Sequence, residues 1–355
     1  MRRVLAVAGM ATALTVGVAG PAMACGGLIG PNGAVNLTRT TTFAGYHDGV
    51  EHYVTSFSFA GGGGAFGSLT PLPGVPTKVE RGGDWTLQRL VRETTPLAVE
   101  DAATGAAFSA AAPKSAEVIL QTKVDALDIT VLKGGGAEVG QWATEHGFRL
   151  PPDAPEVLDF YAKRSPIFLA AAFDADAAKK RGQAIGDGTP VHITIPTQNP
   201  WVPLRILGLG KQGAERVDAD VYLLTDRRPA LLSTAEIGDG FGSNRTLTRV
   251  YDQKANALLL DDLRTDKTGS WVPTAGWLTK VRISGEASTL TGDLAIDATG
   301  AQRPSFVAAG YSVPEAVAAA PDTRRSSSTA PAVLLGLGLG VLLAIAAVGA
   351  LRRSS

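Results

Sequence analysis

Alternating hydrophobic and polar residues predict a β-hairpin in the first part of the chain. Over residues 50–60, Tyr53 and Phe57 fall on one face of an extended strand and His52 falls on the other. A His-Asp-Gly turn precedes this segment and follows the Thr-rich residues 37–46. Two extended runs joined by an Asp-Gly turn are typical of a β-hairpin.

Short extended patterns recur along most of the remaining chain. Strands are predicted over residues 66–72, 118–124, 129–133, 167–173, 191–196, 203–209, 217–225, 231–237, 277–283 and 293–296. Residues 238–276 are less regular, and the Ala-rich residues 97–115 are predicted to be a surface excursion.

Four short helices are predicted between these strands. Asp84 is a candidate N-cap of one helix, and Asp153 with Glu156 forms a capping-box pattern at the start of another. Residues 137–146 and 255–263 also have helical spacing. The side chains predicted to face inward are Leu87, Leu90, Val91, Val139, Trp142, Ala143, Val157, Leu158 and Tyr161. Because strands and helices do not alternate regularly, the pattern favours an α+β fold: an antiparallel, β-rich domain with a few inserted helices.

Residues 332–351 are apolar on every side, unlike the segments before them. A helix of this length spans about 30 Å, the thickness of the hydrocarbon core of a bilayer. The segment is predicted to be one C-terminal transmembrane helix, and the alternative is a buried core helix that lacks a polar face. Gly336 and Gly340 lie one turn apart in this helix, a spacing that can bring two membrane helices together. A weak homodimer through this helix is therefore a candidate interaction.

Residues 1–24 have the pattern of a secretory signal peptide. A short basic start is followed by an apolar stretch and by a small-x-small ending at Ala24. Cleavage is predicted between Ala24 and Cys25, and a retained anchor is the alternative. Cys25 would then be the first residue of the mature chain, as in a lipoprotein. However, the position that normally holds a Leu-like residue holds Ala22, which favours an unmodified thiol.

A cleaved signal peptide and one span place residues 25–331 outside the membrane and residues 352–355 inside. The outer part comprises the α+β domain at 25–297, as one unit or two subdomains, and an Ala-, Pro- and Ser-rich stalk at 298–331. The predicted location is the cell membrane, with the lipid bilayer as one partner and with the bulk of the chain extracytoplasmic.

The charge of the outer part argues against nucleic-acid binding. Four of the 33 Lys and Arg lie at the two ends of the chain (Arg2, Arg3, Arg352 and Arg353), whereas all 33 Asp and Glu lie between them. The outer part therefore has a formal charge of −4, and it lacks the basic surplus that a nucleic-acid partner requires. Its single Cys excludes an internal disulfide.

Several stretches spread over most of the outer domain match one family pattern. In chain order they are Ala24–Gly27, Phe66–Pro76, Thr130–Lys133, Trp142–Pro152, Ile195–Leu209 and Trp277–Arg282. In these stretches the chain resembles a bacterial family of secreted proteins, the domain of unknown function 2330. The resemblance implies no particular activity and no catalytic residues. Family members often have a second Cys five residues after the first, where this chain has Gly30, so a paired-thiol role is not expected.

No motif for metal or nucleophilic chemistry is found in the sequence. None of the four histidines, His47, His52, His146 and His192, has His-Glu-x-x-His or Cys-x-x-Cys neighbours. His47 and His52 could face each other across the predicted hairpin, but a turn histidine and a strand histidine are the simpler interpretation. Gly-x-Ser-x-Gly and Ser-x-x-Lys are also missing. Neither a metal nor a cofactor is predicted.

Two further groups of residues leave alternatives open. Asp261, Asp262 and Asp266 are close in sequence but lack the spacing of a calcium-binding loop, which favours a solvated acidic turn. Trp201 ends the polar segment 197–201, where it could contact a ligand or pack inward, and inward packing is favoured.

The leading hypothesis is a single-pass envelope protein without enzymatic activity, whose outer domain binds an envelope protein or a surface polymer. The alternative is an extracellular hydrolase with an unrecognised active site. A deep pocket that gathers Asp226, Asp239 and His192 would favour the hydrolase, whereas a closed surface with exposed aromatic loops would favour binding. A membrane sensor or assembly subunit is a third hypothesis, limited by the short tail at 352–355.

Overall fold

The computed structural model describes residues 27–30, 33–34, 40–57, 67–95, 116–182, 188–297 and 300–315. The predicted signal peptide with Ala24 and Cys25, the predicted membrane helix with Gly336 and Gly340, and most of the predicted stalk lie outside the described residues. The chain divides into two units, Met1–Tyr311 and Ser312–Ser355, and the fold below is that of the first. None of the helices in the described ranges is long and apolar enough to cross a membrane.

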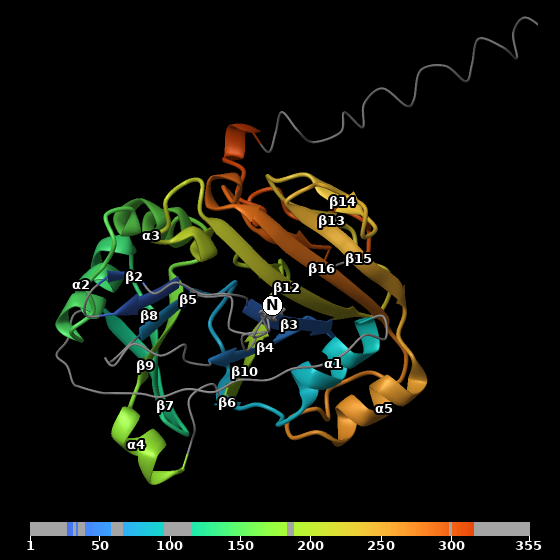
Figure 1. The fold of residues 1–355 in the computed structure, drawn as a ribbon, viewed down its shortest axis with the longest axis horizontal. Helices are drawn as coiled ribbons and strands as arrows, with labels where there is room; N and C mark the ends of the chain where they lie inside the picture. The colour runs from blue at the N-terminus through green and yellow to red at the C-terminus, as the bar shows by residue number, and fades with distance from the viewer. Residues whose placement is uncertain are drawn as a thin grey trace, which may run out of the picture. The chain divides into compact units, whose positions relative to one another are not determined.

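The first unit is built on three β-sheets (Figure 1). The eight-stranded sheet contains, in spatial order, β14 (Ile237–Asp239), β15 (Leu247–Lys254), β16 (Trp277–Glu286), β12 (Arg216–Thr225), β3 (Thr40–His47), β4 (Val50–Phe57), β10 (Thr189–Pro196) and β6 (Lys78–Arg81). The six-stranded sheet contains β2 (Gly33–Ala34), β1 (Gly27–Gly30), β5 (Gly67–Pro71), β9 (Ile167–Phe173), β8 (Leu127–Lys133) and β7 (Glu117–Val124). A small third sheet contains β11 (Trp201–Val202), β17 (Leu294–Ile296) and β13 (Leu231–Leu232).

Helices α1 (Thr86–Thr94) and α5 (Ala257–Thr265) cover the outer face of the eight-stranded sheet, and α2 (Gly136–Glu145) and α3 (Ala154–Ala162) cover that of the six-stranded sheet. The short helix α4 (Ala175–Lys180) follows β9, and the 3-10 turns are η1 (Arg205–Gly208) and η2 (Ala287–Thr289). Among the described strands, β12 with β3 and β14 with β15 pair in parallel, and the other pairs are antiparallel. The predicted β-rich fold with antiparallel sheets and a few helices is therefore confirmed.

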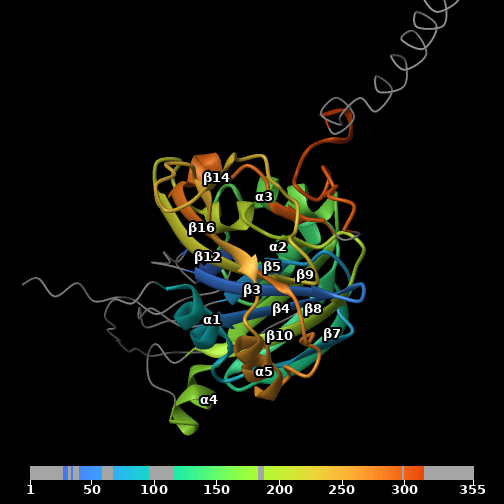
Figure 2. The ribbon, with the colours of Figure 1, turned by 90° about the vertical axis from the view of Figure 1, so that its right-hand side faces the viewer.

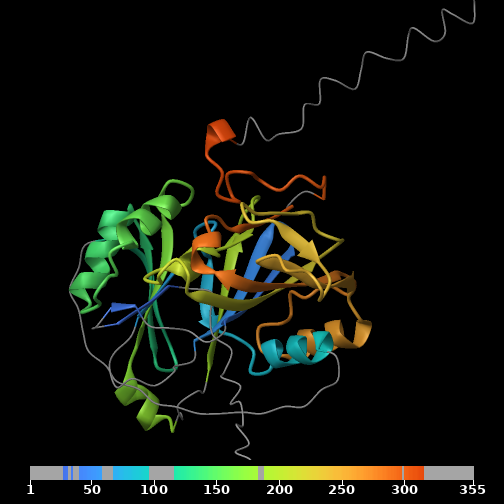
Figure 3. The ribbon, with the colours of Figure 1, turned by 45° about the horizontal axis from the view of Figure 1, so that its top comes forward.

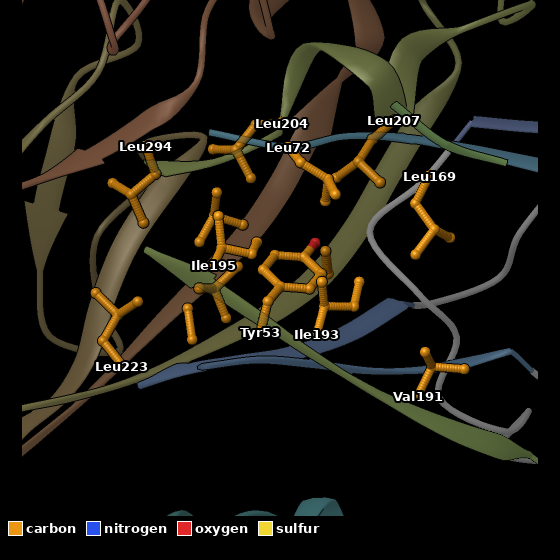
Figure 4. Packing of buried hydrophobic residues seen from close by; sticks show 14 of the residues in the cluster. Tyr53, Leu72, Leu169, Val191, Ile193, Ile195, Leu204, Leu207, Leu223 and Leu294 are labelled. Atoms are coloured by element: carbon orange, nitrogen blue, oxygen red, sulfur yellow. The ribbon is translucent and has the colours of Figure 1, made fainter. Parts of the chain in front are cut away.

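The layers run from helices through two sheets to helices (Figures 1 and 3). The main core lies between the two large sheets, where side chains from both inner faces and from the small sheet meet. Figure 4 shows Tyr53 of β4 in this core, surrounded by Ile193, Leu169 and Leu204 from three other segments. Helices α2 and α3 cover the six-stranded sheet. Helices α1 and α5 lie together on the eight-stranded sheet (Figure 2). Burying one large apolar side chain in such a core contributes about 1.5–3 kcal/mol.

The predicted hairpin is present as β3 and β4. Asp48 and Gly49 both have positive φ angles, of 49° and 77°, which is the conformation of the two central residues of a type I′ turn. Both faces of β4 are buried, since Tyr53 contributes to the main core and Val54 to the core under α1 and α5. The strand is thus central, with no solvent-facing side.

The helix faces were predicted more accurately than the helix ends. Of the side chains predicted to face inward, Val91 is exposed and the others are buried. Asp84 does not cap α1, because its carboxylate pairs with Arg81 instead. Asp153 likewise makes no cap bond to α3, because it accepts a hydrogen bond from the backbone N–H of Gly210. Both predicted caps are wrong because a partner elsewhere in the chain takes the carboxylate.

Residues 203–209 contain the 3-10 turn η1 rather than the predicted strand. Leu204 and Leu207 reach the main core, whereas Ile206 and Leu209 reach the core under α2 and α3. This spacing of three residues places side chains above one another in a 3-10 turn. Residues 238–276 also differ from the prediction, because they contain the eight-residue strand β15 in addition to the predicted helix, α5.

Candidate functional site

The residues that would favour a hydrolase are not gathered at one place. Asp226 is half exposed and lies 2.7 Å from Nδ1 of His47, whereas Asp239 is exposed and lies 3.5 Å from Arg249. His192, on β10 of the eight-stranded sheet, is buried and pairs with His52 rather than with either aspartate. Among the described residues, these contacts do not place Asp226 or Asp239 beside His192 in a pocket, as the hydrolase hypothesis requires.

His52 and His192 form a buried pair on the face of the sheet that α1 and α5 cover. Nδ1 of His52 lies 3.0 Å from Nε2 of His192, and the indole of Trp271 stacks on His52 with ring centroids 3.9 Å apart. Nδ1 of His192 has no hydrogen-bond partner and lies 3.8 Å from a carboxylate oxygen of Glu80. The absence of a side chain at Gly45 leaves room for Trp271, since a Cβ at position 45 would lie 1.9 Å from the indole ring.

Burial determines the charge of this histidine pair. It lowers the pKa of His52 to about 3, with a smaller contribution from His192, and lowers the pKa of His192 to about 4. Both rings are therefore neutral at physiological pH, and one donates its N–H to the other. His47 and His52 do not face each other across the hairpin, because His52 pairs in register with Gly45 and His47 with Val50, in agreement with the simpler interpretation.

The three clustered aspartates have three different partners. Asp261 pairs with Arg264, and Asp262 lies 2.8 Å from Arg89 of α1. Asp266 is buried and accepts hydrogen bonds from the start of α1, so the prediction of a solvated turn is wrong for this residue. No group of three or more His, Cys, Asp or Glu residues in the part that the structure describes could hold a metal ion.

A second buried carboxylate, Asp293, organises the surroundings of Trp201. Asp293 accepts hydrogen bonds from the Tyr161 hydroxyl and from the backbone N–H groups of Leu204 and Arg205, and it pairs with Arg164. Trp201 is 3% exposed and stacks on Tyr161, so it packs inward as favoured. Because all these donors are satisfied by one carboxylate, the cluster stabilises the junction of α3, η1 and the small sheet.

Exposed polar, cationic and aromatic side chains lie together at the other end of the eight-stranded sheet, around Phe241. A depression of about 200 Å³ is present there, which we call the Phe241 depression. It is lined by Phe241, Ser243, Asn244, Arg245, Thr248, Val250, Arg282 and Ser284. These residues come from the β14–β15 connection, from β15 and from the second half of β16.

The topology of the edge strands explains why the depression forms. β14 and β15 are parallel, so residues 240–246 must return along the pair before β15 begins. This return passes over the sheet face that carries Thr248 and Arg282, which are register partners on β15 and β16. A turn closed by the bond from the N–H of Ser243 to the carbonyl of Gly240 places Phe241 at its tip, where 56% of the residue stays exposed.

Arg282 is the one cation that lines the depression without an acidic partner among the described residues. Its guanidinium lies 5.3 Å from the centroid of the Phe241 ring, a cation–π contact, and its Nε is buried without a hydrogen-bond partner. Arg245, by contrast, is paired with Glu236. The depression therefore offers an aromatic ring beside an uncompensated positive charge.

A second depression, of about 300 Å³, lies between α1 and α5 and has a different character. It is lined by Arg89, Arg92, Glu93 and Asp262. Arg89 is paired with both Glu93 and Asp262, at 2.8 Å each, so most of its charge is compensated within the protein. This depression has no aromatic side chain in its lining.

The sequence comparisons decide the family. The model of the domain of unknown function 2330, an uncharacterized protein conserved in bacteria, matches residues 19–297. The chain belongs to this family. No curated protein matches the sequence.

Among solved structures, the family member described here is similar to baculovirus P35. A mutated P35 after caspase cleavage is 7% identical, with 73% of this chain and 99% of that chain covered and a TM-score of 0.37. P35 by itself is also 7% identical, with 73% and 96% covered and a TM-score of 0.37. P35 in its complex with caspase-8 is 7% identical, with 73% of this chain and 90% of that chain covered and a TM-score of 0.33. At these TM-scores the likeness supports no conclusion about fold or function.

The stretches that resemble the 2330 family are mainly structural where they are described. Trp201 and Leu204 are buried, and Leu72 belongs to the main core. Arg282 is the exception, since it ends the last stretch and lines the Phe241 depression. The sequence interpretation missed Phe241, although an aromatic residue between Gly240 and Gly242 in a polar segment is a usable signal of an exposed turn.

Proposed function

We propose that this protein is a binding module of the bacterial cell envelope, without catalytic activity, and that the Phe241 depression is its ligand-binding surface. The observation that carries the proposal is the pair of an exposed aromatic ring and an unpaired guanidinium. Aromatic and Arg side chains are enriched where proteins recognise partners, and here one of each lies in the same depression.

The predicted signal peptide, stalk and membrane span support a location for this module outside the membrane. In that arrangement residues 25–331 are extracytoplasmic and residues 352–355 are cytoplasmic. An epitope tag after Ser355 is expected to be protected from protease that is added to intact, wall-stripped cells. A tag within residues 316–331 is expected to be cut. Cleavage of both tags, or of neither, would contradict this topology.

Binding to the envelope is tested by sedimentation with isolated, detergent-extracted bacterial walls. The full chain is kept in mild detergent, so that its predicted membrane helix has no lipid to enter. The wild-type chain is expected to sediment with the walls, and Phe241→Ala to sediment at least about tenfold more weakly, as for loss of a central aromatic contact. Leu258→Ala removes another exposed apolar side chain, on α5, and serves as the matched control. Equal sedimentation of all three chains would reject the depression as the binding surface.

A further inference from the structure

We infer that the Phe241 depression binds a carboxylated sugar within an acidic surface polysaccharide. This inference rests on the proposed function and specifies its ligand class. Three properties of the depression carry it: its size, its aromatic rim and its single uncompensated cation.

Size limits the ligand to one small unit at a time. Pockets for drug-sized molecules usually have volumes of about 300–1,000 Å³, and the Phe241 depression has about 200 Å³. The volume suits one ring of a longer chain that passes over the surface. The sheet edge permits such a passage, since the turn residues Phe241 and Asn244 are exposed.

Phe241 supplies a surface for the apolar face of a sugar ring. The C–H groups on one face of a pyranose pack against aromatic rings, whereas a linear polyol phosphate has no such face. Phe241 is 56% exposed while Arg282 contacts its ring, so the aromatic group is held in place and still accessible.

Arg282 supplies the partner for a carboxylate. A guanidinium presents parallel N–H donors that match a carboxylate. Arg282 has no acidic partner among the described residues, and because its Nε is buried, a ligand would bind the other guanidinium N–H groups. Neighbouring cations are already used, since Arg245 pairs with Glu236 and Arg216 lies 3.8 Å from Asp218. The depression therefore has one positive charge to offer, which matches one carboxylate per sugar unit.

Polar side chains around the rim can bind sugar hydroxyl groups. The Asn244 side chain makes no hydrogen bond within the described residues, which leaves both a donor and an acceptor for a ligand. The Ser243 hydroxyl accepts from the N–H of Arg245 and keeps its own hydrogen to donate. Hydroxyl groups that both donate and accept fit such a mixed rim.

Affinity electrophoresis of the full chain in mild detergent tests the inference. Native gels contain polygalacturonate, neutral dextran or polyphosphate as the named probes. Polygalacturonate is expected to retard the wild-type chain, and Phe241→Ala and Arg282→Gln are each expected to weaken retardation at least about tenfold. Lys254→Gln is the control, because Lys254 is an exposed cation at the opposite end of β15, outside the depression. Dextran is expected to cause no retardation.

Other outcomes would reject a carboxylated sugar as the ligand. They also distinguish failure of this inference from failure of the proposed binding function. Equal retardation by polyphosphate would show a preference for negative charge alone, and equal loss in Lys254→Gln would show a general charge effect. If the chain sediments with walls in a Phe241-dependent manner but ignores polygalacturonate, the carboxylated-sugar assignment is wrong and the binding module stands. If the chain neither sediments with walls nor is retarded by polygalacturonate, both proposals fail.

Discussion

At the scale of single residues, buried ionisable side chains connect the fold of this protein to pH. Glu51 on β4 is fully buried, and neither of its carboxylate oxygens has a hydrogen-bond partner. Burial, the larger effect, raises its pKa to about 8, and the nearby backbone N–H of Trp201 acts in the opposite direction. Glu51 is therefore predominantly neutral at pH 7 and acts as a polar member of the core.

Glu51 is expected to make the protein less stable as pH rises from about 4.5 to about 8. Over this range the folded state holds a proton that the unfolded state has released, so the free energy of unfolding falls by on the order of 3–5 kcal/mol. In Glu51→Gln, the free energy of unfolding measured with urea should not show this decrease between pH 5 and pH 8. Glu138→Gln, at an exposed position of α2, should unfold like the wild type. An unchanged pH dependence in Glu51→Gln would mean that Glu51 is charged in the core.

The His52–His192 pair is expected to have the opposite effect at lower pH. The unfolded rings take up protons near pH 6.5, while the folded rings resist until about pH 4 and about pH 3. Stability from the neutral pair is full above pH 6.5 and falls as pH decreases through this window. His192→Gln should reduce this dependence, measured by the midpoint of chemical unfolding between pH 7 and pH 4. The result would be contradicted if His192→Gln lost stability on acidification as steeply as the wild type. The Glu51→Gln background separates the two effects where their pH windows overlap.

At the scale of elements, α1 depends on a residue far away in sequence. The Asp266 carboxylate, just after α5, accepts from the backbone N–H groups of Asp84 and Trp85 and from the hydroxyl of Thr86, at 3.1, 3.3 and 2.6 Å. These groups lie at and just before the start of α1, so Asp266 holds the segment from which the helix begins. Helix α1 is thus joined to α5 by these hydrogen bonds as well as by packing.

Two aspartates distinguish this arrangement from the local cap that the sequence predicts. Asp266→Ala is expected to lower the free energy of unfolding by about 1–3 kcal/mol, since it leaves buried donors without an acceptor. Asp84→Ala is expected to change it by less than about 0.5 kcal/mol, because Asp84 is largely exposed and makes a surface pair with Arg81. Chemical denaturation of both variants measures the difference. Equal losses, or a larger loss in Asp84→Ala, would restore the local cap.

Local signals predicted the elements that local geometry determines. The Asp48–Gly49 turn needs only two residues that accept positive φ angles, and the inward face of α2 follows from its own helical spacing. Long-range partners decided the elements that were missed. η1 forms where Asp293 accepts from the N–H groups of Leu204 and Arg205, and no pattern within residues 203–209 indicates that distant carboxylate.

The candidate site was not predictable to the same extent. Phe241 is a local signal, but Arg282 is 41 residues further along the chain and reads as an ordinary outward-facing strand residue. Its register partner on β12 is Asp220, whose carboxylate pairs with Lys280 instead. Such competition for partners exists only in the folded chain.

At the scale of the whole molecule, the chemistry is divided between a closed interior and one open edge. The histidine pair, Glu51 and Asp293 are enclosed by the layers of helices and sheets. The uncompensated Arg282 and the exposed Phe241 lie together where α1 and α5 no longer cover the eight-stranded sheet. The buried groups therefore contribute to stability, and we propose that binding takes place at the edge.

Hydrogen–deuterium exchange of the full chain, with and without soluble wall fragments released by a muramidase, tests this assignment most directly. Binding at the Phe241 depression should slow exchange in residues 240–250 and 280–285 and leave α1 and α5 unchanged, since ligand contact protects only the backbone that it covers or stabilises. Phe241→Ala should lose this protection at the same fragment concentration. Protection centred on α1 and α5 instead, or no protection at any fragment concentration in the wild-type chain, would contradict the assignment.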